Sequence, residues 1–162
     1  MSKRVGFEVT ATSAAPRQTV FALVQNGASW PTWSPLGSFE LHRPSADGGE
    51  GVGAIRYFKT GNVTSQEEIV ALTPGRSLSY VAFAGLPLKD HRADVELSDA
   101  PGGGTTIIWR EAFRPRYPGT GWLIRRFLRC FVQKCADGLA QAAAKAEAPA
   151  ADAAERSAPR AR

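Results

Sequence analysis

The hydrophobic pattern of the chain changes its period near residue 119, and this change constrains the fold more than any other feature. Between residues 53 and 113 the apolar residues fall in short runs separated by turn residues, which is typical of β-strands joined by tight turns. From Gly119 to about Ala146 they recur with the 3.6-residue period of an amphipathic helix. One long helix with a single apolar face therefore follows a run of strands, and the two must pack together.

The strand-like runs predict an antiparallel meander of seven strands. We expect them over the ranges 5–11, 39–43, 53–60, 63–72, 77–83, 91–97 and 105–113. After the first strand a helix should end by residue 26, and the two prolines of WPTWSP (30–35) predict only a short helical turn or a loop. Short connections favour antiparallel pairing. The fold class is thus α+β, a curved antiparallel sheet of about seven strands around a long C-terminal helix. For the strands over 53–60 and 63–72, the pattern does not decide which face points inward.

The predicted C-terminal helix carries an apolar stripe that should face the sheet, with Phe131 at its centre and Arg129 on the solvent side. The stripe consists of Ile124, Phe127, Leu128, Phe131, Cys135, Leu139 and Ala142. Truncation of Phe131 to alanine is expected to cost about 3–5 kcal/mol, and that of Arg129 less than about 0.5 kcal/mol. A sheet curved around one helix need not close at its centre, so we expect a cavity between them.

Length and composition predict one folded domain with a tail. The chain has 162 residues, a net charge of +5 and 43% hydrophobic residues. We assign residues 1–146 to a single domain. The remaining segment, 147–162, contains only Ala, Pro, Glu, Asp, Arg and Ser, and is predicted to be disordered because it offers no apolar face.

Several classes of protein are excluded at this stage. No apolar run approaches the roughly 18 residues of a membrane-spanning helix, and the N-terminus alternates instead of forming a signal peptide. We therefore expect a cytoplasmic protein. The two histidines, His42 and His91, have no second ligand at metal spacing, and no phosphate-binding loop or nucleophile elbow occurs. Neither a metal nor a cofactor is expected.

Three local patterns carry a resemblance to a known family. A helix opening at Ala15-Pro16 is followed by WPTWSP (30–35). Next, Gly51–Gly53 leads into a strand, and the following strand ends in ALTPGR (71–76). Finally, WR (109–110), FRP (113–115) and PGTGW (118–122) lead into the last helix. In this combination the chain resembles the START-like or SRPBCC superfamily, also called polyketide cyclase/dehydrase-like, over about residues 5–146. The resemblance implies the helix-grip fold.

The resemblance leaves three functions open. The first is a binding module that holds one lipid, fatty acid or polyketide-like compound between sheet and helix. The second is a cofactor-free enzyme of the cyclase/dehydratase type acting in the same cavity. The third is a stress-related or regulatory protein that acts through protein contacts. No family motif carries a catalytic residue onto this chain, so the first is preferred.

Two residues are candidates for proton transfer. His91 shares strand parity with Ala93, and Glu111 shares it with Trp109, so both should point inward. The simpler interpretations are a histidine satisfied by a neighbouring backbone group and a glutamate paired with Arg56 or Arg92. We list His91 and Glu111 as catalytic candidates, and predict the ligand-binding set as Trp30, Trp33, Tyr57, Tyr80, His91, Trp109, Glu111, Phe113, Phe127 and Phe131.

Positive charge gathers before and within the predicted helix. Seven arginines and lysines face only one acidic residue between residues 110 and 134. A solvated face is the simpler interpretation. The alternative is contact with an anionic membrane surface through Arg125, Arg126 and Arg129. No stacking aromatics interleave with the basic stripe, so nucleic acid is not expected as a partner. A homodimer stays open.

Overall fold

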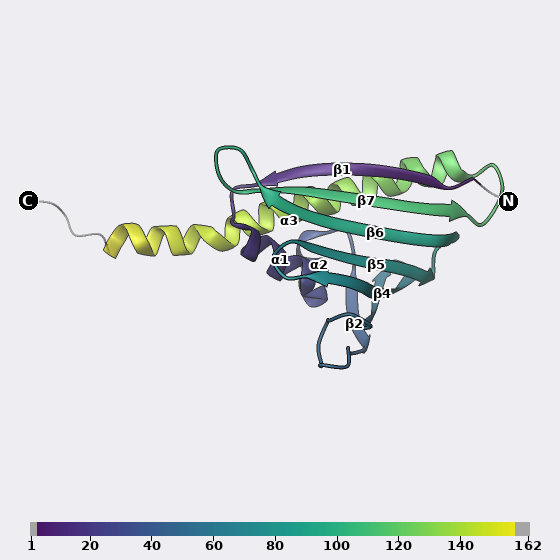
Figure 1. Cartoon of the computed structure of the whole chain (residues 1–162), viewed down its shortest axis with the longest axis horizontal. Helices are drawn as coiled ribbons and strands as arrows, with labels where there is room; N and C mark the ends of the chain where they lie inside the picture. Colours follow the sequence, from purple (N-terminus) through teal and green to yellow (C-terminus); the bar gives the residue numbers. More distant parts are fainter. Residues whose placement is uncertain (1–2, 158–162) are drawn as a thin grey trace, which may run out of the picture.

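A seven-stranded sheet, a long C-terminal helix and a short helical region after the first strand make up the computed structural model, which describes residues 3–157 (Figure 1). The elements are β1 (Val5–Ser13), α1 (Arg17–Gln25), η1 (Gly27–Ser29), α2 (Trp30–Trp33), β2 (Ser38–Arg43), β3 (Ile55–Thr60), β4 (Val63–Thr73), β5 (Ser77–Ala84), β6 (Leu88–Asp99), β7 (Thr105–Pro115) and α3 (Gly121–Ser157). Neighbouring strands are antiparallel in the order β1-β7-β6-β5-β4-β3-β2. The predicted α+β class and strand number are confirmed.

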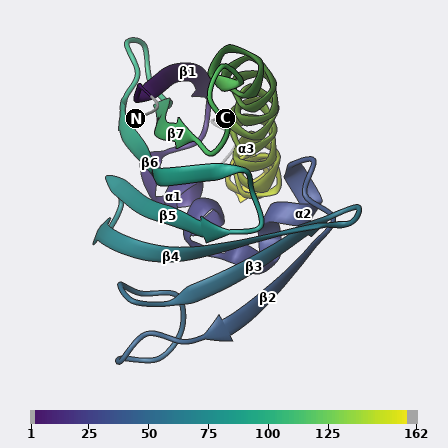
Figure 2. The same cartoon turned by 90° about the vertical axis from the view of Figure 1, so that its right-hand side faces the viewer.

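The sheet curves around α3, as Figure 2 shows with the helix seen nearly end-on. The short helices α1 and α2 lie on the same concave side. Packing of α3 and the short helices against one sheet face buries a single core that runs from β1 to β3. The expected helix-grip arrangement is confirmed.

Strict alternation identifies the inner face of the sheet. On β7 every second residue from Thr105 to Pro115 is buried, so Trp109 and Glu111 point inward as predicted. On β6 the inward set includes His91, also as predicted. The open question of β3 and β4 is settled, because Arg56 and Phe58 on β3, and the corresponding β4 positions 67 and 69, are the buried ones.

The buried stripe of α3 differs from the predicted one. It consists of Leu128, Val132, Cys135, Ala136, Leu139, Ala140 and Ala143. Phe127 is 67% exposed and Phe131 is only half-buried, so the prediction that Phe131 stands at the centre of the stripe is wrong, and the cost predicted for its truncation loses its basis. The stripe is rotated toward the alanines because small side chains let the helix lie close to the rest of the core. Arg129 is exposed, as predicted.

Polar contacts fix α3 along β1, the edge strand of the sheet. Arg125 Nε donates to the carbonyl oxygen of Gly6 at 2.9 Å, and Gln133 Nε2 donates to that of Thr10 at 3.1 Å. Further along, Ser13 Oγ donates to the carbonyl oxygen of Ala140 at 2.7 Å. The first two bonds satisfy backbone carbonyl groups of an edge strand that would otherwise be open to another strand.

The helix α3 is longer than predicted. It continues past residue 146 to Ser157, through part of the segment expected to be disordered, and its last turns project beyond the sheet (Figure 1). Alanine, the strongest helix former, dominates this segment and explains the continuation. Residues 158–162 of the expected tail lie outside the described residues. Within the described chain, no helix is both long enough and apolar enough to cross a bilayer.

Candidate functional site

A cavity lies between the concave face of the sheet and α3. Its volume is about 120 Å³, roughly ten times the space needed to hold one water molecule. Its walls include the rings of Trp30, Phe58 and Phe131. Phe127 and Val63 also line it and are 67% and 45% exposed, so the cavity reaches the surface between α3 and the β3–β4 turn.

Most of the predicted ligand-binding residues meet at this cavity. Seven of the ten line it, and they are Trp30, Tyr80, His91, Trp109, Glu111, Phe127 and Phe131. Their convergence follows from the inward parity of β5, β6 and β7, from the position of α3 above them, and from α2, which carries Trp30. Their part in ligand binding stays a prediction.

The other three predicted residues lie elsewhere. Tyr57 sits on the outer face of β3, because its neighbours on the strand point inward, and its ring stacks on His42 with centroids 4.3 Å apart. Trp33 is buried behind Trp30, and its Nε1 donates to Ser29 Oγ at 3.0 Å. Phe113 is fully buried in the core and does not line the cavity.

A buried polar cluster forms one side of the cavity. The backbone N–H of Ala82 donates to His91 Nδ1 at 2.9 Å, so this nitrogen is unprotonated and the neutral ring carries its proton on Nε2. His91 Nε2 lies 3.4 Å from Glu111 Oε2, and Tyr80 Oη donates to Glu111 Oε1 at 3.4 Å. Both distances are long for a hydrogen bond. Burial, together with the Glu111 carboxylate, raises the pKa of Tyr80 well above its ordinary value.

The predicted pairing of Glu111 with Arg56 or Arg92 is wrong. Arg92 is on the outer face of β6, where it pairs with Asp94. Arg56 instead binds Glu67, which is its direct neighbour across the β3–β4 ladder. The backbone interpretation of His91 is correct in part, since Ala82 satisfies one of its nitrogens.

Sequence reasoning missed the buried guanidinium of Arg56. It is completely shielded from solvent and lies over the ring of Trp30, 4.9 Å from its centroid. It donates to Glu67 through Nε at 3.0 Å and through Nη2, and Nη1 lies 3.4 Å from Glu50 Oε2. Burial raises the pKa of Glu67, although the Arg56 guanidinium opposes this shift. Arg56 and Phe58 lie on the same face of β3, so the sequence would have placed the Arg56 guanidinium inside if the inner face of β3 had been known.

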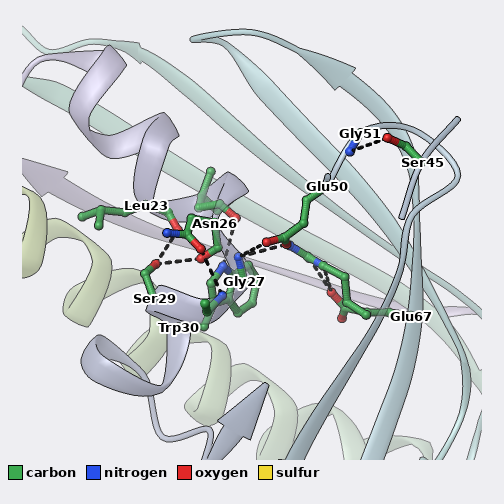
Figure 3. Close-up of polar contacts among 12 residues, drawn as sticks. Leu23, Asn26, Gly27, Ser29, Trp30, Ser45, Glu50, Gly51 and Glu67 are labelled. Atoms are coloured by element: carbon green, nitrogen blue, oxygen red, sulfur yellow. Dashed lines mark hydrogen bonds and ion pairs between the residues drawn. The ribbon is translucent and has the colours of Figure 1, made fainter. Parts of the chain in front are cut away.

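Glu50 extends this cluster to the short helices. Both of its carboxylate oxygens accept from the backbone N–H of Gly27 at 2.9 Å, where η1 begins (Figure 3). Trp30 comes directly after η1 and donates from Nε1 to the carbonyl oxygen of Val24 at 2.9 Å. The chain of contacts from Glu67 through Arg56 and Glu50 therefore holds the wall of the cavity that contains Trp30.

One buried polar atom of a residue that lines the cavity has no protein partner among the described residues. Trp109 is 1% exposed and lines the cavity, yet its Nε1–H has no hydrogen-bond acceptor within residues 3–148. Buried donors nearly always find an acceptor. Among the described residues, no group of three histidine, cysteine, aspartate or glutamate side chains has a metal-binding arrangement.

Comparison with known proteins identifies the family. The model of the family described as "Polyketide cyclase / dehydrase and lipid transport" matches residues 4–147, nearly the whole described chain. The chain belongs to this family. The START-like assignment made from sequence is thereby confirmed, and the polyketide cyclase/dehydrase fold provides a ligand-binding domain. A search of curated proteins returns no match.

Solved structures agree on the fold. The protein XoxI from Bacillus cereus matches with a TM-score of 0.72 and 15% identity, over 85% of this chain and 94% of its own. A START superfamily protein from Mycobacterium smegmatis matches with a TM-score of 0.72 and 12% identity, over 88% and 97%. Ara h 8.0201 matches with a TM-score of 0.69 and 17% identity, over 87% and 98%. Identities this low establish a shared architecture and nothing about the ligand.

Proposed function

We propose that the protein binds one small hydrophobic molecule, of a lipid-like or polyketide-like class, in the cavity between the sheet and α3. The observation that carries this proposal is the cavity itself, which is walled by aromatic rings and reaches the surface beside Phe127. A concave apolar space with a few convergent polar groups is the usual form of a ligand site. The family, whose description includes lipid transport, supports the same function.

Native mass spectrometry of freshly purified protein, followed by displacement of an apolar fluorescent probe, tests this function. A larger side chain at Ala82, which lines the cavity, should fill the space, so Ala82→Phe is expected to abolish probe binding. Val81 is the neighbouring residue on β5 and does not line the cavity, so Val81→Phe serves as the control and should bind the probe normally. Absence of both a co-purified mass and probe binding in the wild type would refute the proposal.

A second function is favoured by the His91–Glu111 pair, which lies buried against the same cavity. Because His91 Nδ1 accepts from Ala82, a ligand can bond only to Nε2–H, which lies 3.4 Å from Glu111 Oε2 and can only donate. Glu111 would remove a proton from the carbon beside a ligand ketone and return it to the enolate oxygen. His91 Nε2–H would stabilise that oxygen by a hydrogen bond, so the ketone becomes an enol without a cofactor.

Exchange of the α-hydrogens of 1-tetralone in deuterated water measures this chemistry directly. The wild type should accelerate exchange by at least about 100-fold, the lower end of general acid–base catalysis. Glu111→Gln should remove the acceleration, whereas Glu96→Gln, at an exposed position on β6, should keep it. Exchange at the uncatalysed rate in the wild type excludes the enzymatic function and leaves ligand binding intact.

A further inference from the structure

The residues that line the cavity carry both hydrogen-bond donors and hydrogen-bond acceptors, and the balance between them limits which ligands the cavity can bind. Trp109 Nε1–H is a donor without an acceptor among the described residues, whereas Trp30 and Trp33 both have theirs. The lining also includes two carboxylates, Glu67 and Glu111. Trp109 Nε1–H therefore lacks an acceptor, whereas the carboxylates of Glu67 and Glu111 can accept a hydrogen bond from a donor group on the ligand.

Acidic side chains outnumber basic ones around the cavity. The carboxylates of Glu50, Glu67 and Glu111 are all less than one-sixth exposed, and Arg56 is the one buried guanidinium set against them in the described chain. Arg56 already binds two of the three carboxylates and does not line the cavity. An anionic ligand would bring another negative charge into a site of low dielectric without a free cation to meet it.

We propose that the ligand is a neutral hydrophobic molecule with a phenolic, enolic or alcoholic hydroxyl, and not a fatty-acid anion. Its hydroxyl oxygen accepts from Trp109 Nε1–H, and its hydroxyl hydrogen is donated to Glu111. Both residues occupy adjacent inward positions of β7, about 7 Å apart along the strand, and both line the cavity. This inference rests on the proposed binding function and names the substrate class of the same site.

Three probes of one shape separate the possible chemistries. The wild type should bind 2-naphthol at least about tenfold more tightly than 2-methylnaphthalene, because only the naphthol satisfies Trp109. It should bind 2-naphthoate more weakly than either neutral probe. In a ¹H–¹⁵N correlation spectrum, the indole signal of Trp109 should shift on addition of 2-naphthol and stay nearly unchanged with 2-methylnaphthalene.

Two variants assign the effect to named groups. Trp109→Phe keeps a ring and removes the donor, so it should lose the preference for 2-naphthol while it still binds 2-methylnaphthalene, which also reports that it is folded. Glu111→Gln removes a carboxylate, so the difference in affinity between 2-naphthoate and the neutral probes should become smaller. Binding of 2-methylnaphthalene as tight as that of 2-naphthol refutes the inference and preserves the binding function. Tighter binding of 2-naphthoate, or no binding of any probe, also refutes it, and in the last case the apolar-probe assay decides the binding function separately.

A different observation concerns the outer surface at the start of α3. Trp122, Leu123 and Phe127 are 70%, 55% and 67% exposed, although large apolar side chains are normally buried. Arg126 lies on the same side of the helix, and Arg129 adjoins it one turn further along. We call these five residues the arginine–aromatic face. No acidic residue occurs between Gly121 and Lys134 to neutralise it.

We infer that the arginine–aromatic face docks on an anionic lipid bilayer. Exposed aromatic rings flanked by arginines are complementary to the boundary between anionic headgroups and acyl chains. Phe127 belongs both to this face and to the lining of the cavity, so docking would place the cavity opening against the membrane.

Co-sedimentation with vesicles tests this surface. The full chain should bind vesicles of phosphatidylcholine with phosphatidylserine and should not bind phosphatidylcholine alone. Arg126→Glu combined with Arg129→Glu should weaken binding at least about tenfold. The control reverses two exposed arginines near the other end of the sheet, Arg43→Glu with Arg76→Glu, and changes the net charge equally. Equal losses in both double variants, or no binding by the wild type, overturn the assignment of this face.

Discussion

Replacement of Gly138 by alanine tests how closely α3 lies against α2 beside the cavity. Gly138 is an internal residue of α3, where alanine is normally the better helix former by about 1 kcal/mol. A Cβ added at Gly138 would lie 1.7 Å from the carbonyl oxygen of Trp33 and 2.9 Å from its carbonyl carbon. The first distance is half of the 3.4 Å at which ordinary contact begins, so helix propensity and packing predict opposite signs.

The magnitudes decide in favour of packing. The obstructing atoms belong to the backbone, so no rotation of a side chain can relieve the contact. The two helices must separate instead, and overpacking of this kind costs about 1–3 kcal/mol, occasionally more. The 1.7 Å approach to a backbone oxygen puts the overpacking cost at the upper end of that range, about 3 kcal/mol. After the gain of about 1 kcal/mol in helix propensity is subtracted, we expect Gly138→Ala to lower the free energy of unfolding by about 2 kcal/mol. Because Trp30 belongs to α2, the shift should also weaken probe binding in the cavity.

Urea denaturation followed by circular dichroism measures the change. Gln141→Ala, at an exposed position one turn further along α3, changes helix propensity without entering the core, and should stay within about 0.5 kcal/mol of the wild type. A Gly138→Ala variant more stable than the wild type by about 1 kcal/mol, the propensity term alone, would contradict the close approach of α2 and α3.

Three further measurements follow from burial. Leu139→Ala, at a fully buried position of α3, should cost about 2–5 kcal/mol in urea denaturation. Leu123→Ala, at an exposed position of the same helix, should cost less than about 0.5 kcal/mol, and equal losses would contradict the observed stripe. Burial raises the pKa of Cys135, so a thiol reagent should label the exposed Cys130 in the folded protein and Cys135 only after unfolding. Burial, then a nearby carboxylate, also raises the pKa of Tyr80 above 10.0, so stability should fall as pH rises beyond that value, and Tyr80→Phe should flatten this fall in alkaline urea titrations.

The sequence predicted most of the fold because its signals there were local. On β7 the apolar members of the alternating set outnumber the polar ones, so the inward position of Trp109 follows from one strand alone. On β3 and β4 each face mixes charged and apolar residues. What places Arg56 inside is its register opposite Glu67 on the next strand, and this pairing is visible only when the two strands are aligned. Buried ion pairs are therefore hard to find by alternation.

The buried stripe of α3 shows a different limit. Large apolar residues weigh most in a hydrophobic pattern, so the sequence centred the stripe on Phe131 and included Phe127. The contacts that decide the rotation of the helix involve small residues such as Ala136, which is fully buried, and Gly138, which touches α2 through its backbone. Close approach of backbones favours small side chains, and a pattern weighted by hydrophobicity does not count them. Phe127 and Phe131 instead line the cavity, and Phe127 is also exposed at the surface.

The buried polar groups near the cavity are of two kinds: those that find hydrogen-bond partners among the described residues and those that do not. Arg56 finds its acceptors in Glu67 and Glu50, and these contacts fix the wall that contains Trp30. Trp109 finds none within the described residues, and a buried donor left unpaired costs about 1–3 kcal/mol. A phenylalanine at this position would remove the unpaired donor, although its ring is smaller than the indole. The unpaired indole therefore lowers the stability of the protein without a ligand. On our proposal, a ligand that supplies the missing acceptor regains this free energy on binding. The specificity of the cavity then depends mainly on this one atom.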